Sequence, residues 1–222
     1  LRRAHLDQVV AALWPSRSGT RRAYSGALAQ RNALISRIRQ GRASRSSMAV
    51  WDREVARHGI ALRADRSQAV EQLTAPFAAA AADLGLAGEA ALQERPVKRA
   101  ANEEQLAEQL AEGLDADLER GFTQRGPHRD DLTLLRCDPT THPTAARELR
   151  SYGSQGEQRI ALLALLLAER EAIAEARGHP PLLLLDDVMS ELDAGRRENL
   201  VDRVRAGGQA LITTTDVGHV PG

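Results

Sequence analysis

The sequence predicts two parts of different fold class: an all-α antiparallel helical arm over residues 1–120 and an α/β lobe over residues 121–222. Up to about residue 120, apolar residues recur at the spacing of helices. After Gly121, short apolar runs alternate with helical patterns, and strand, helix, strand in succession is typical of a parallel sheet. The run of four leucines at 182–185 is the centre of that lobe.

Composition limits the class of protein. A chain of 222 residues holds one or two domains, and with 3% aromatic residues its core must be built of Leu, Ala, Val and Ile. The single cysteine, Cys137, excludes an intramolecular disulfide and fits a reducing compartment, so we expect a cytoplasmic protein. The longest apolar run, 160–168, is far shorter than the roughly 20 residues of a membrane span. No signal peptide is visible, so no membrane partner is expected.

Charge is distributed unevenly, although 30 basic and 30 acidic residues cancel over the chain. Residues 1–45 hold ten arginines and one acidic residue, Asp7, so this region carries +9 and the remainder −9. Clustered basic residues predict contact with a polyanion such as DNA. A solvated helix surface in an arginine-rich proteome explains the same bias, since the chain has one lysine, Lys98. The arginines expected to bind DNA are Arg21, Arg22, Arg37 and Arg39.

Helical periodicity predicts four helices in the arm, at 1–13, 20–40, 48–84 and 103–119. Gly59 is a point at which the third helix could be interrupted. The segment 85–96 contains Gly and Pro and is expected to be irregular, so no strand is predicted in this half. The apolar stripes are expected to form the arm's own core rather than a groove for a partner.

In the lobe, strands are predicted at 132–135 and 147–152. A long helix follows at 154–177, which Gly178 and Pro180 end. The leucine strand leads to a helix at 193–207, and a last strand is predicted at 209–214.

The segment 180–193 reads PPLLLLDDVMSELD. Four consecutive leucines do not alternate between sheet faces, and they predict a strand buried on both faces. Asp186 and Asp187 follow at the carboxyl end of the strand, the edge at which open α/β sheets bind ligands. One carboxylate there can reach Mg²⁺ and the other a water molecule. The two aspartates alone are equally compatible with a turn or a cap on the next helix.

The start of the 154–177 helix also carries a chemical signal. Ser154 with Glu157 three residues later forms a capping-box pattern. Free N–H groups and partial positive charge at a helix amino terminus suit a phosphate, and Gly156 lets a ligand approach the backbone. An ordinary cap is the alternative. The position of this cap, on the helix that leads into the leucine strand, favours a phosphate site.

Together these segments resemble the ABC-type ATPases. Residues 152–159, YGSQGEQR, are similar to the signature motif, 182–187 to the Walker B strand and 190–193, SELD, to the D-loop. The segments GPHRDDL at 126–132, LLLLDDVMSELD at 182–193 and ITTTD at 212–216 are also similar to the RecF family, bacterial DNA replication and repair proteins related to SMC ATPases. The resemblance covers nearly the whole chain and implies that the lobe is part of an ABC-type ATPase head.

The resemblance implies roles for individual residues. Asp186 would hold Mg²⁺, and Asp187 would be the general base for the attacking water. Because Asp is one methylene shorter than the Glu of most ABC ATPases, slow hydrolysis is expected. The residues that would contact ATP bound to a partner subunit are Ser154, Gln155, Gly156 and Glu157. Those expected in the D-loop at the dimer interface are Ser190 and Asp193.

Two departures from the ABC pattern matter. The Walker A loop, G-x-x-x-x-G-K-[ST], is absent. The chain, which begins at Leu1, is therefore expected to be a carboxyl-terminal portion that is inactive in hydrolysis alone. Where many relatives have a switch histidine, this chain has Thr215, and His219 lies beyond the matching position. No switch role is assigned.

The order His128-Arg129-Asp130 is also that of kinase catalytic loops, but no Asn follows at the required position and no D-F-G is present. A metal site formed by His128, Asp130 and Asp131 is one alternative. A turn held by structural hydrogen bonds between arm and lobe is favoured.

The resemblance implies an ATP-dependent DNA-binding protein of recombinational repair, replication restart and the SOS response. It would bind single-stranded DNA and gapped or linear double-stranded DNA, form an ATP-dependent homodimer with ATP and Mg²⁺, and assist recombinase loading with RecO and RecR. Another SMC-like ATPase is an alternative, which a long heptad coiled coil would favour, and none is present. The other alternative is a non-catalytic interaction module that truly lacks Walker A.

Overall fold

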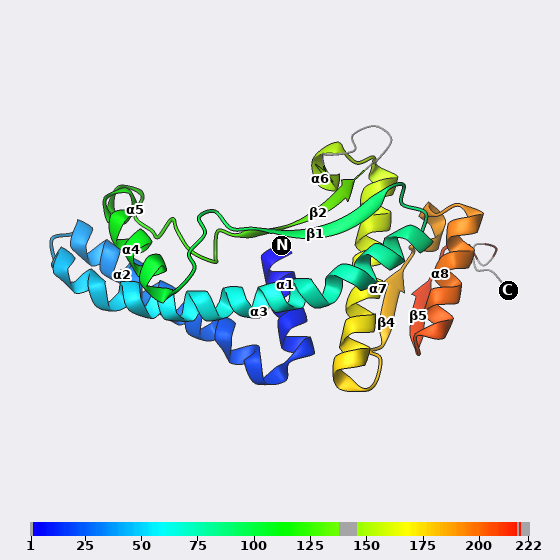
Figure 1. Cartoon of the computed structure of the whole chain (residues 1–222), viewed down its shortest axis with the longest axis horizontal. Helices are drawn as coiled ribbons and strands as arrows, with labels where there is room; N and C mark the ends of the chain where they lie inside the picture. Colours follow the sequence, from blue (N-terminus) through cyan, green and yellow to red (C-terminus); the bar gives the residue numbers. More distant parts are fainter. Residues whose placement is uncertain (1, 138–145, 217, 219–222) are drawn as a thin grey trace. The chain divides into compact units, whose positions relative to one another are not determined.

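The computed structural model describes residues 2–137, 146–216 and 218. The chain divides into two compact units (Figure 1), the first made of residues 1–69 and 94–132 and the second of residues 70–93 and 133–222. The boundaries between these units differ from the boundary predicted at residue 120. The reason is that the segment 70–93 packs with the carboxyl-terminal residues.

The first unit is helical. Its elements are α1 (Arg2–Leu13), α2 (Ser18–Arg39), the first part of α3 (Met48–Asp83), α4 (Glu103–Glu112) and α5 (Leu114–Arg120), with short 3-10 turns at Pro15–Arg17 and Arg45–Ser47. Tyr24, early in α2, packs with Leu62, whereas Ile35, near its end, packs with Met48 at the start of α3. The two long helices are therefore antiparallel, as predicted for the arm. Leu106 and Leu110 of α4 complete the core, which confirms that the apolar stripes pack on one another.

A buried arginine crosslinks the first unit. Arg31 is 0% exposed, and its Nε donates to Asp52 Oδ1 at 2.8 Å. Its Nη1 donates to Asp117 Oδ2 at 2.6 Å and to Thr123 Oγ1 at 2.7 Å, and its Nη2 donates to the Leu110 carbonyl at 3.1 Å. Burial raises the pKa of the Asp52 carboxyl, and the nearby Arg31 opposes that rise. Arg31 thus joins α2 to α3, α4 and α5 through charge-assisted bonds.

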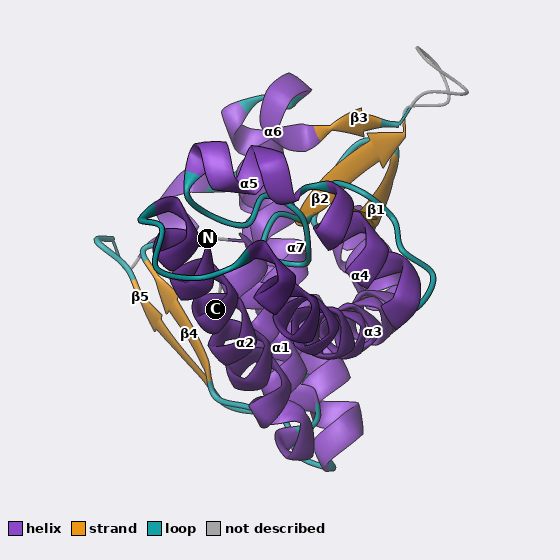
Figure 2. Cartoon of the chain, turned by 90° about the vertical axis from the view of Figure 1, so that its left-hand side faces the viewer, coloured by secondary structure: helices purple, strands orange, loops and turns teal. Residues whose placement is uncertain are grey.

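The second unit contains the βαβ arrangement that the sequence predicts. Strand β4 (Leu183–Asp186) pairs in parallel with β5 (Ala210–Thr213), with Leu184 opposite Leu211, and the two strands lie side by side in Figure 2. The helices of this part are α6 (Leu149–Tyr152), α7 (Gln155–Arg177) and α8 (Ala194–Ala206), with a 3-10 turn at Met189–Glu191. Strands β1 (Glu89–Arg95), β2 (Asp131–Cys137) and β3 (Arg147–Glu148) form a second sheet in the order β1-β2-β3.

Several predicted elements are corrected by the structure. The segment expected to be irregular contains β1, in which Ala90 and Leu92 alternate as buried residues, so the absence of strands from this half is wrong. The strand predicted at 147–152 is extended over two residues and then turns into α6. Gly113 ends α4 and separates it from α5, whereas α3 continues through Gly59.

The leucine strand is not buried on both faces. Leu183 and Leu185 are 8% and 3% exposed, whereas Leu184 is 63% exposed. Leu182 and Leu211 share this exposure at 60% and 61%. The prediction is wrong for the described residues because the side chains do alternate, and one face of the β4–β5 pair carries no covering layer among them. No helix in the described part of the chain has the length and apolarity needed to cross a membrane.

Candidate functional site

The amino terminus of α7 has the predicted capping box. The Ser154 hydroxyl accepts from the Glu157 N–H at 3.2 Å, and the Glu157 carboxylate accepts from the Ser154 N–H at 2.8 Å. The first amides of a helix have no partner within the helix, so those of Gln155 and Gly156 face outward. Apart from its chain neighbours and the backbone of its own helix, no atom lies within 4 Å of the position that a Cβ on Gly156 would take. The helix start is therefore accessible to an anion.

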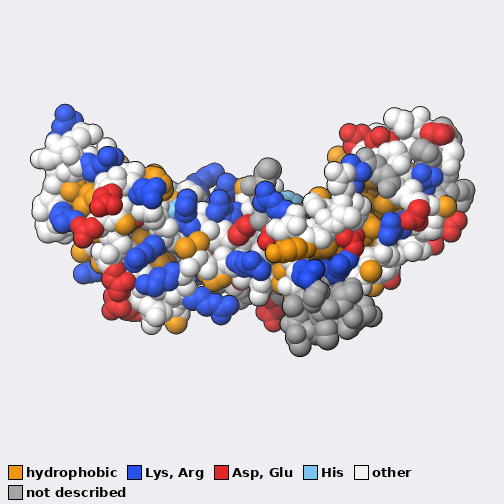
Figure 3. All heavy atoms as spheres, turned by 90° about the horizontal axis from the view of Figure 1, so that it is seen from above, with side chains coloured by type: hydrophobic (Ala, Val, Ile, Leu, Met, Phe, Trp, Pro, Cys, Tyr) orange, Lys and Arg blue, Asp and Glu red, His pale blue; other side chains and the backbone are white. Residues whose placement is uncertain are grey.

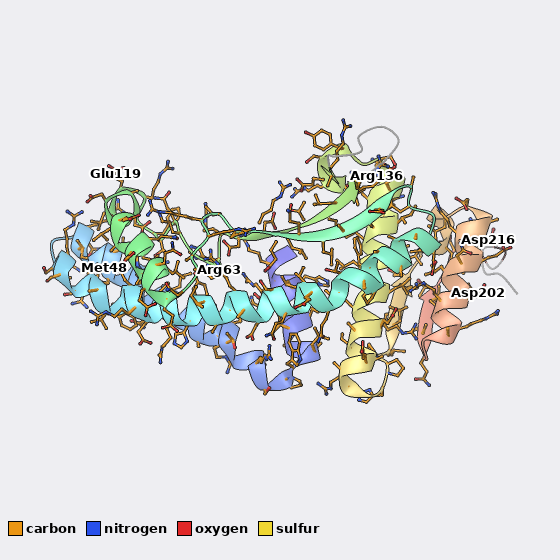
Figure 4. All side chains as sticks on the ribbon, in the orientation of Figure 1. Met48, Arg63, Glu119, Arg136, Asp202 and Asp216 are labelled. Atoms are coloured by element: carbon orange, nitrogen blue, oxygen red, sulfur yellow. The ribbon has the colours of Figure 1, made fainter. Side chains whose placement is uncertain are left out.

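Arg136 on β2 adds a positive charge beside this helix start (Figure 4). Its guanidinium forms an ion pair with Glu157. The Ser154 N–H bond and the Arg136 charge lower the pKa of the Glu157 carboxyl. Glu157 thus stays ionised at neutral pH, and its carboxylate holds the helix start in place. Arg136 was not singled out from the sequence, because its partner lies 21 residues away on another element.

Strand β5 and the residues that follow it hold the two acids at the end of β4. The Thr213 hydroxyl donates to Asp186 Oδ1 at 2.5 Å. The N–H of Asp187 donates to the Thr213 carbonyl at 3.2 Å, and the N–H and hydroxyl of Thr215 both donate to Asp187 Oδ1 at 3.4 Å. Asp187 has a positive φ of 47°, which is uncommon for a residue other than glycine. Backbone conformations of this kind occur at functional sites.

Asp186 therefore accepts a hydrogen bond from Thr213, and Asp187 accepts hydrogen bonds from Thr215. The two threonines are two residues apart in the chain. In both carboxylates the bonds just described use Oδ1. A hydrated Mg²⁺ is commonly bound through one or two carboxylates together with water and phosphate oxygens. The donor set at Asp186 and Asp187 fits such an ion. The described residues contain no cluster of three or more ligating side chains that would form an all-protein metal site.

The segment 190–193, predicted to be the D-loop, follows the two acids closely in the chain. The Ser190 hydroxyl donates to the Asp187 carbonyl at 2.9 Å. Asp193 caps α8, accepting from the Arg196 N–H at 3.0 Å, and its side chain is exposed. The short connection at 178–182 reverses the chain between α7 and β4. Strand β4 consequently runs back along α7, toward the end at which that helix begins (Figure 1).

The arginines predicted to bind DNA lie on α2 of the first unit. Arg21 contacts Asp7, with 3.4 Å between its Nε and Oδ2. Arg22, Arg37 and Arg39 are exposed, and none forms an ion pair with another described residue. On the face shown in Figure 3, basic side chains outnumber acidic ones over the helices of this unit.

The segment 126–131 is a structural turn within the first unit. The Tyr24 hydroxyl lies 2.6 Å from His128 Nδ1, and His128 Nε2 lies 2.9 Å from the Thr123 carbonyl. Because a carbonyl accepts, Nε2 carries the proton and Nδ1 accepts from Tyr24. Burial lowers the pKa of His128 and raises that of Tyr24. The histidine is therefore neutral.

Arg63 fixes the other end of this turn (Figure 4). Its Nε and Nη2 donate to Asp130 Oδ2 and Oδ1 at 2.7 and 3.0 Å. With Asp130 bound to Arg63 and His128 bound on both ring nitrogens, these side chains are not arranged as metal ligands. The turn is thus held by hydrogen bonds, as the favoured interpretation of the sequence has it.

The chain is similar in sequence to known proteins. No protein-family model matches the chain. The DNA replication and repair protein RecF of Moorella thermoacetica is 37% identical over 198 residues, which are 89% of this chain and 51% of that protein. RecF of Anaeromyxobacter dehalogenans strain 2CP-1 is 38% identical over 228 residues, covering 97% of this chain and 57% of that protein. The chain therefore spans about half the length of the curated relatives it matches.

Solved structures agree with the sequence comparison. The structure of the recombination mediator protein RecF with ATP, in the RecFOR pathway, matches with a TM-score of 0.82 at 27% identity over 97% of this chain and 57% of that chain. A second RecF structure, with ATPrS, matches with a TM-score of 0.80 at 26% identity and covers 100% of this chain and 59% of that one. These matches confirm the predicted fold class, an ABC-type ATPase head lobe with a helical arm.

Proposed function

Because this chain belongs to the RecF family of DNA replication and repair proteins, we propose that it supplies the arm, signature motif, Walker B acids and D-loop of an ATP-dependent DNA-binding protein. The observation that carries the proposal is the pairing of Asp186 and Asp187 with Thr213 and Thr215 at the end of β4. This pairing lies in a chain whose fold matches a RecF structure with ATP.

The two acids take different roles in the proposed mechanism. Asp186 would hold Mg²⁺ through its carboxylate, and the ion would neutralise phosphate charge when bound. Asp187 positions and deprotonates the attacking water through Oδ2, since its Oδ1 accepts both bonds from Thr215. A short side chain on this backbone reaches less far than Glu, so turnover is slow.

The α7 helix start serves the nucleotide of a partner subunit. Ser154, Gln155 and Gly156 offer amides and a hydroxyl to the terminal phosphate of ATP. Glu157 contributes by ordering this helix start through Ser154 and Arg136. Ser190 and Asp193 of the D-loop lie at the interface of the ATP-dependent homodimer. These assignments rest on the signature, Walker B and D-loop resemblance together with the geometry above.

The biological setting follows from the same resemblance. We assign the protein to recombinational repair, replication restart and the SOS response in the cytoplasm, with single-stranded and gapped or linear double-stranded DNA as ligands. Recombinase loading would involve RecO and RecR, in keeping with the RecFOR pathway named for the similar structures. Arg21, Arg22, Arg37 and Arg39 on α2 are proposed to contact DNA phosphates.

Asp187→Asn in the full-length protein tests the catalytic assignment. Asn accepts the positive φ of this position but cannot remove a proton. We expect turnover to fall by about 100-fold or more, while ATP still binds and an ATP-bound dimer accumulates. ATP hydrolysis assays and light scattering after gel filtration measure both effects. Asp202→Asn on the exposed face of α8 is the control, and wild-type turnover in D187N would refute the role of Asp187.

A further inference from the structure

An open hollow of about 260 Å³ lies in the first unit, where α1, α2 and α3 meet the turn at 126–131. Its polar wall is formed by three arginines, one acid and two bonded aromatic side chains. Ligand cavities for small molecules usually measure about 300–1,000 Å³, so this hollow suits a single small group rather than a whole nucleotide. The polar residues that line it are Arg3, Asp7, Arg21, Tyr24, Arg66 and His128.

The hollow has an excess of positive charge. Asp7 is the one acidic side chain among the described residues that line it. Arg66 already binds both carboxylate oxygens of Asp7, at 2.7 and 3.0 Å, and this pair is buried. Arg3 and Arg21 therefore leave the hollow with a net charge of about +2. The exposed Arg129 next to His128 increases the positive potential at the rim.

The two surplus arginines keep donors available. Arg3 uses Nη1 for the Asp130 carbonyl at 3.3 Å, and the Asp130 carboxylate is itself bound by Arg63. Arg21 is 52% exposed, and its Nε lies 3.4 Å from an Asp7 oxygen that Arg66 already binds. A guanidinium presents five donors in a planar fork that matches phosphate oxygens. Arg3 and Arg21 can thus turn toward an anion without breaking the Arg66–Asp7 pair.

The rest of the wall is neutral and firmly held. His128 is bonded on both ring nitrogens, to Tyr24 and to the Thr123 carbonyl. Arg66 also donates to the Pro127 carbonyl at 2.8 Å, which joins α3 to the turn. Neither aromatic side chain contributes a negative charge that would oppose an anion. The hollow therefore has a neutral wall held by hydrogen bonds, beside which the side chains of Arg3 and Arg21 can move.

We propose that the hollow flanked by Arg3 and Arg21 binds a backbone phosphate of nucleic acid. This inference rests on the proposed DNA contact of the first unit and places one phosphate of that contact between α1 and α2. It differs from the surface contacts proposed for Arg37 and Arg39, because the phosphate is received in a hollow that four chain segments build.

Fluorescence anisotropy with labelled single-stranded and duplex oligonucleotides tests this site in the full-length protein, with ATP present, over a range of salt concentrations. Arg3→Ala with Arg21→Ala should weaken binding about tenfold at low salt and reduce the slope of log Kd against log salt by about 1. The control, Arg53→Ala with Arg120→Ala, removes two exposed arginines of the same unit that do not line the hollow. It should bind within about twofold of the unaltered chain.

Ser25→Glu gives a second test that leaves both arginines in place. Ser25 is an exposed α2 residue on the wall of the hollow, so a carboxylate there should also weaken binding without changing the helical circular dichroism signal. Unchanged binding in both altered chains, or an equal loss in the control, overturns the site and leaves the proposed function standing.

Two further outcomes separate the possible ligands. If the unaltered full-length protein binds neither oligonucleotide in the presence of ATP, the proposed DNA contact of the first unit fails together with this site. Inorganic phosphate, titrated by calorimetry, should bind weakly or not at all, because one isolated anion lacks the neighbouring contacts of a DNA backbone. Saturable binding of inorganic phosphate that R3A/R21A abolishes, without an effect of R3A/R21A on oligonucleotides, would make this a free-phosphate site.

Discussion

Thr215 donates to Asp187 twice, through its backbone N–H and its hydroxyl, with both donors 3.4 Å from the same carboxylate oxygen. In the proposed mechanism, the other oxygen, Oδ2, is the one that takes the proton of the attacking water. A residue that acts in this way positions the base without touching the substrate. Thr213 provides the matched case, because its hydroxyl binds the neighbouring acid, Asp186.

Thr215→Val tests this positioning role in the full-length protein. The substitution keeps the shape of the side chain and the backbone N–H but removes the hydroxyl donor. We expect kcat to fall by about tenfold while KM for ATP changes by less than about twofold. Thr215→Ser restores the hydroxyl and should recover most of the activity. Equal losses in the Val and Ser variants would mean that the hydroxyl has no positioning role.

Charge reversal on α2 tests the DNA contact as a whole. With Arg21, Arg22, Arg37 and Arg39 replaced by Glu, DNA affinity at low salt should fall by roughly 100-fold or more, because phosphate contacts dominate sequence-independent binding. Electrophoretic mobility shifts of gapped duplexes measure the loss. Arg150→Glu with Arg205→Glu, two exposed sites of the second unit, should have a much smaller effect. Unchanged affinity of the fourfold variant at low salt would contradict the contact.

Arg31→Met tests the buried network of the arm. It leaves Asp52 and Asp117 buried without their cation, so the free energy of unfolding should fall by about 3–5 kcal/mol in urea titrations. Adding Asp52→Leu removes one stranded carboxylate and should recover part of the loss. A decrease below about 1 kcal/mol for R31M would show that the network contributes little to stability.

The neutral state of His128 predicts how stability depends on pH. Burial lowers its pKa in the folded state below the ordinary value of about 6.5, so the unfolded chain binds more protons below that pH. The contribution of His128 is therefore complete above pH of about 6.5 and is lost as the pH falls toward the folded pKa. His128→Gln should flatten the decline in stability between pH of about 6.5 and 5, measured by urea unfolding. The same change at the exposed His179 should leave the decline as it is, and an unaltered slope in H128Q would contradict the assignment.

Local patterns predicted those parts of the fold that depend on local sequence. Helices α1, α2 and α7 begin and end within about two residues of the predicted positions, because apolar periodicity and terminal glycines are read along one segment. Strand β1 was missed because its residues have weak strand propensity and are extended by pairing with β2, about 40 residues away. The exposure of Leu184 was missed because a run of leucines does not reveal whether a second layer covers it.

In the candidate site, too, the sequence predicted a local feature but not the contacts between distant segments. The capping box at Ser154 and Glu157 follows from a spacing of three residues, and the structure confirms it. The partners of the acids, Thr213 and Thr215, lie 27 and 28 residues downstream of Asp186 and Asp187, so their contacts arise only when β5 pairs with β4. The sequence ITTTD indicated that hydroxyl groups are present here. Its composition did not predict which hydroxyl donates a hydrogen bond to which acid.

The positive φ of Asp187 narrows the set of amino acids that this position can hold. Asp and Asn adopt the left-handed region more readily than longer side chains, because their short polar groups can bond to the local backbone. Replacing Asp187 by Glu would extend the reach of the carboxylate but would increase backbone strain. A longer acid would therefore not by itself make a faster enzyme. An engineer seeking faster turnover would have to reshape the loop at 187–190 together with the acid.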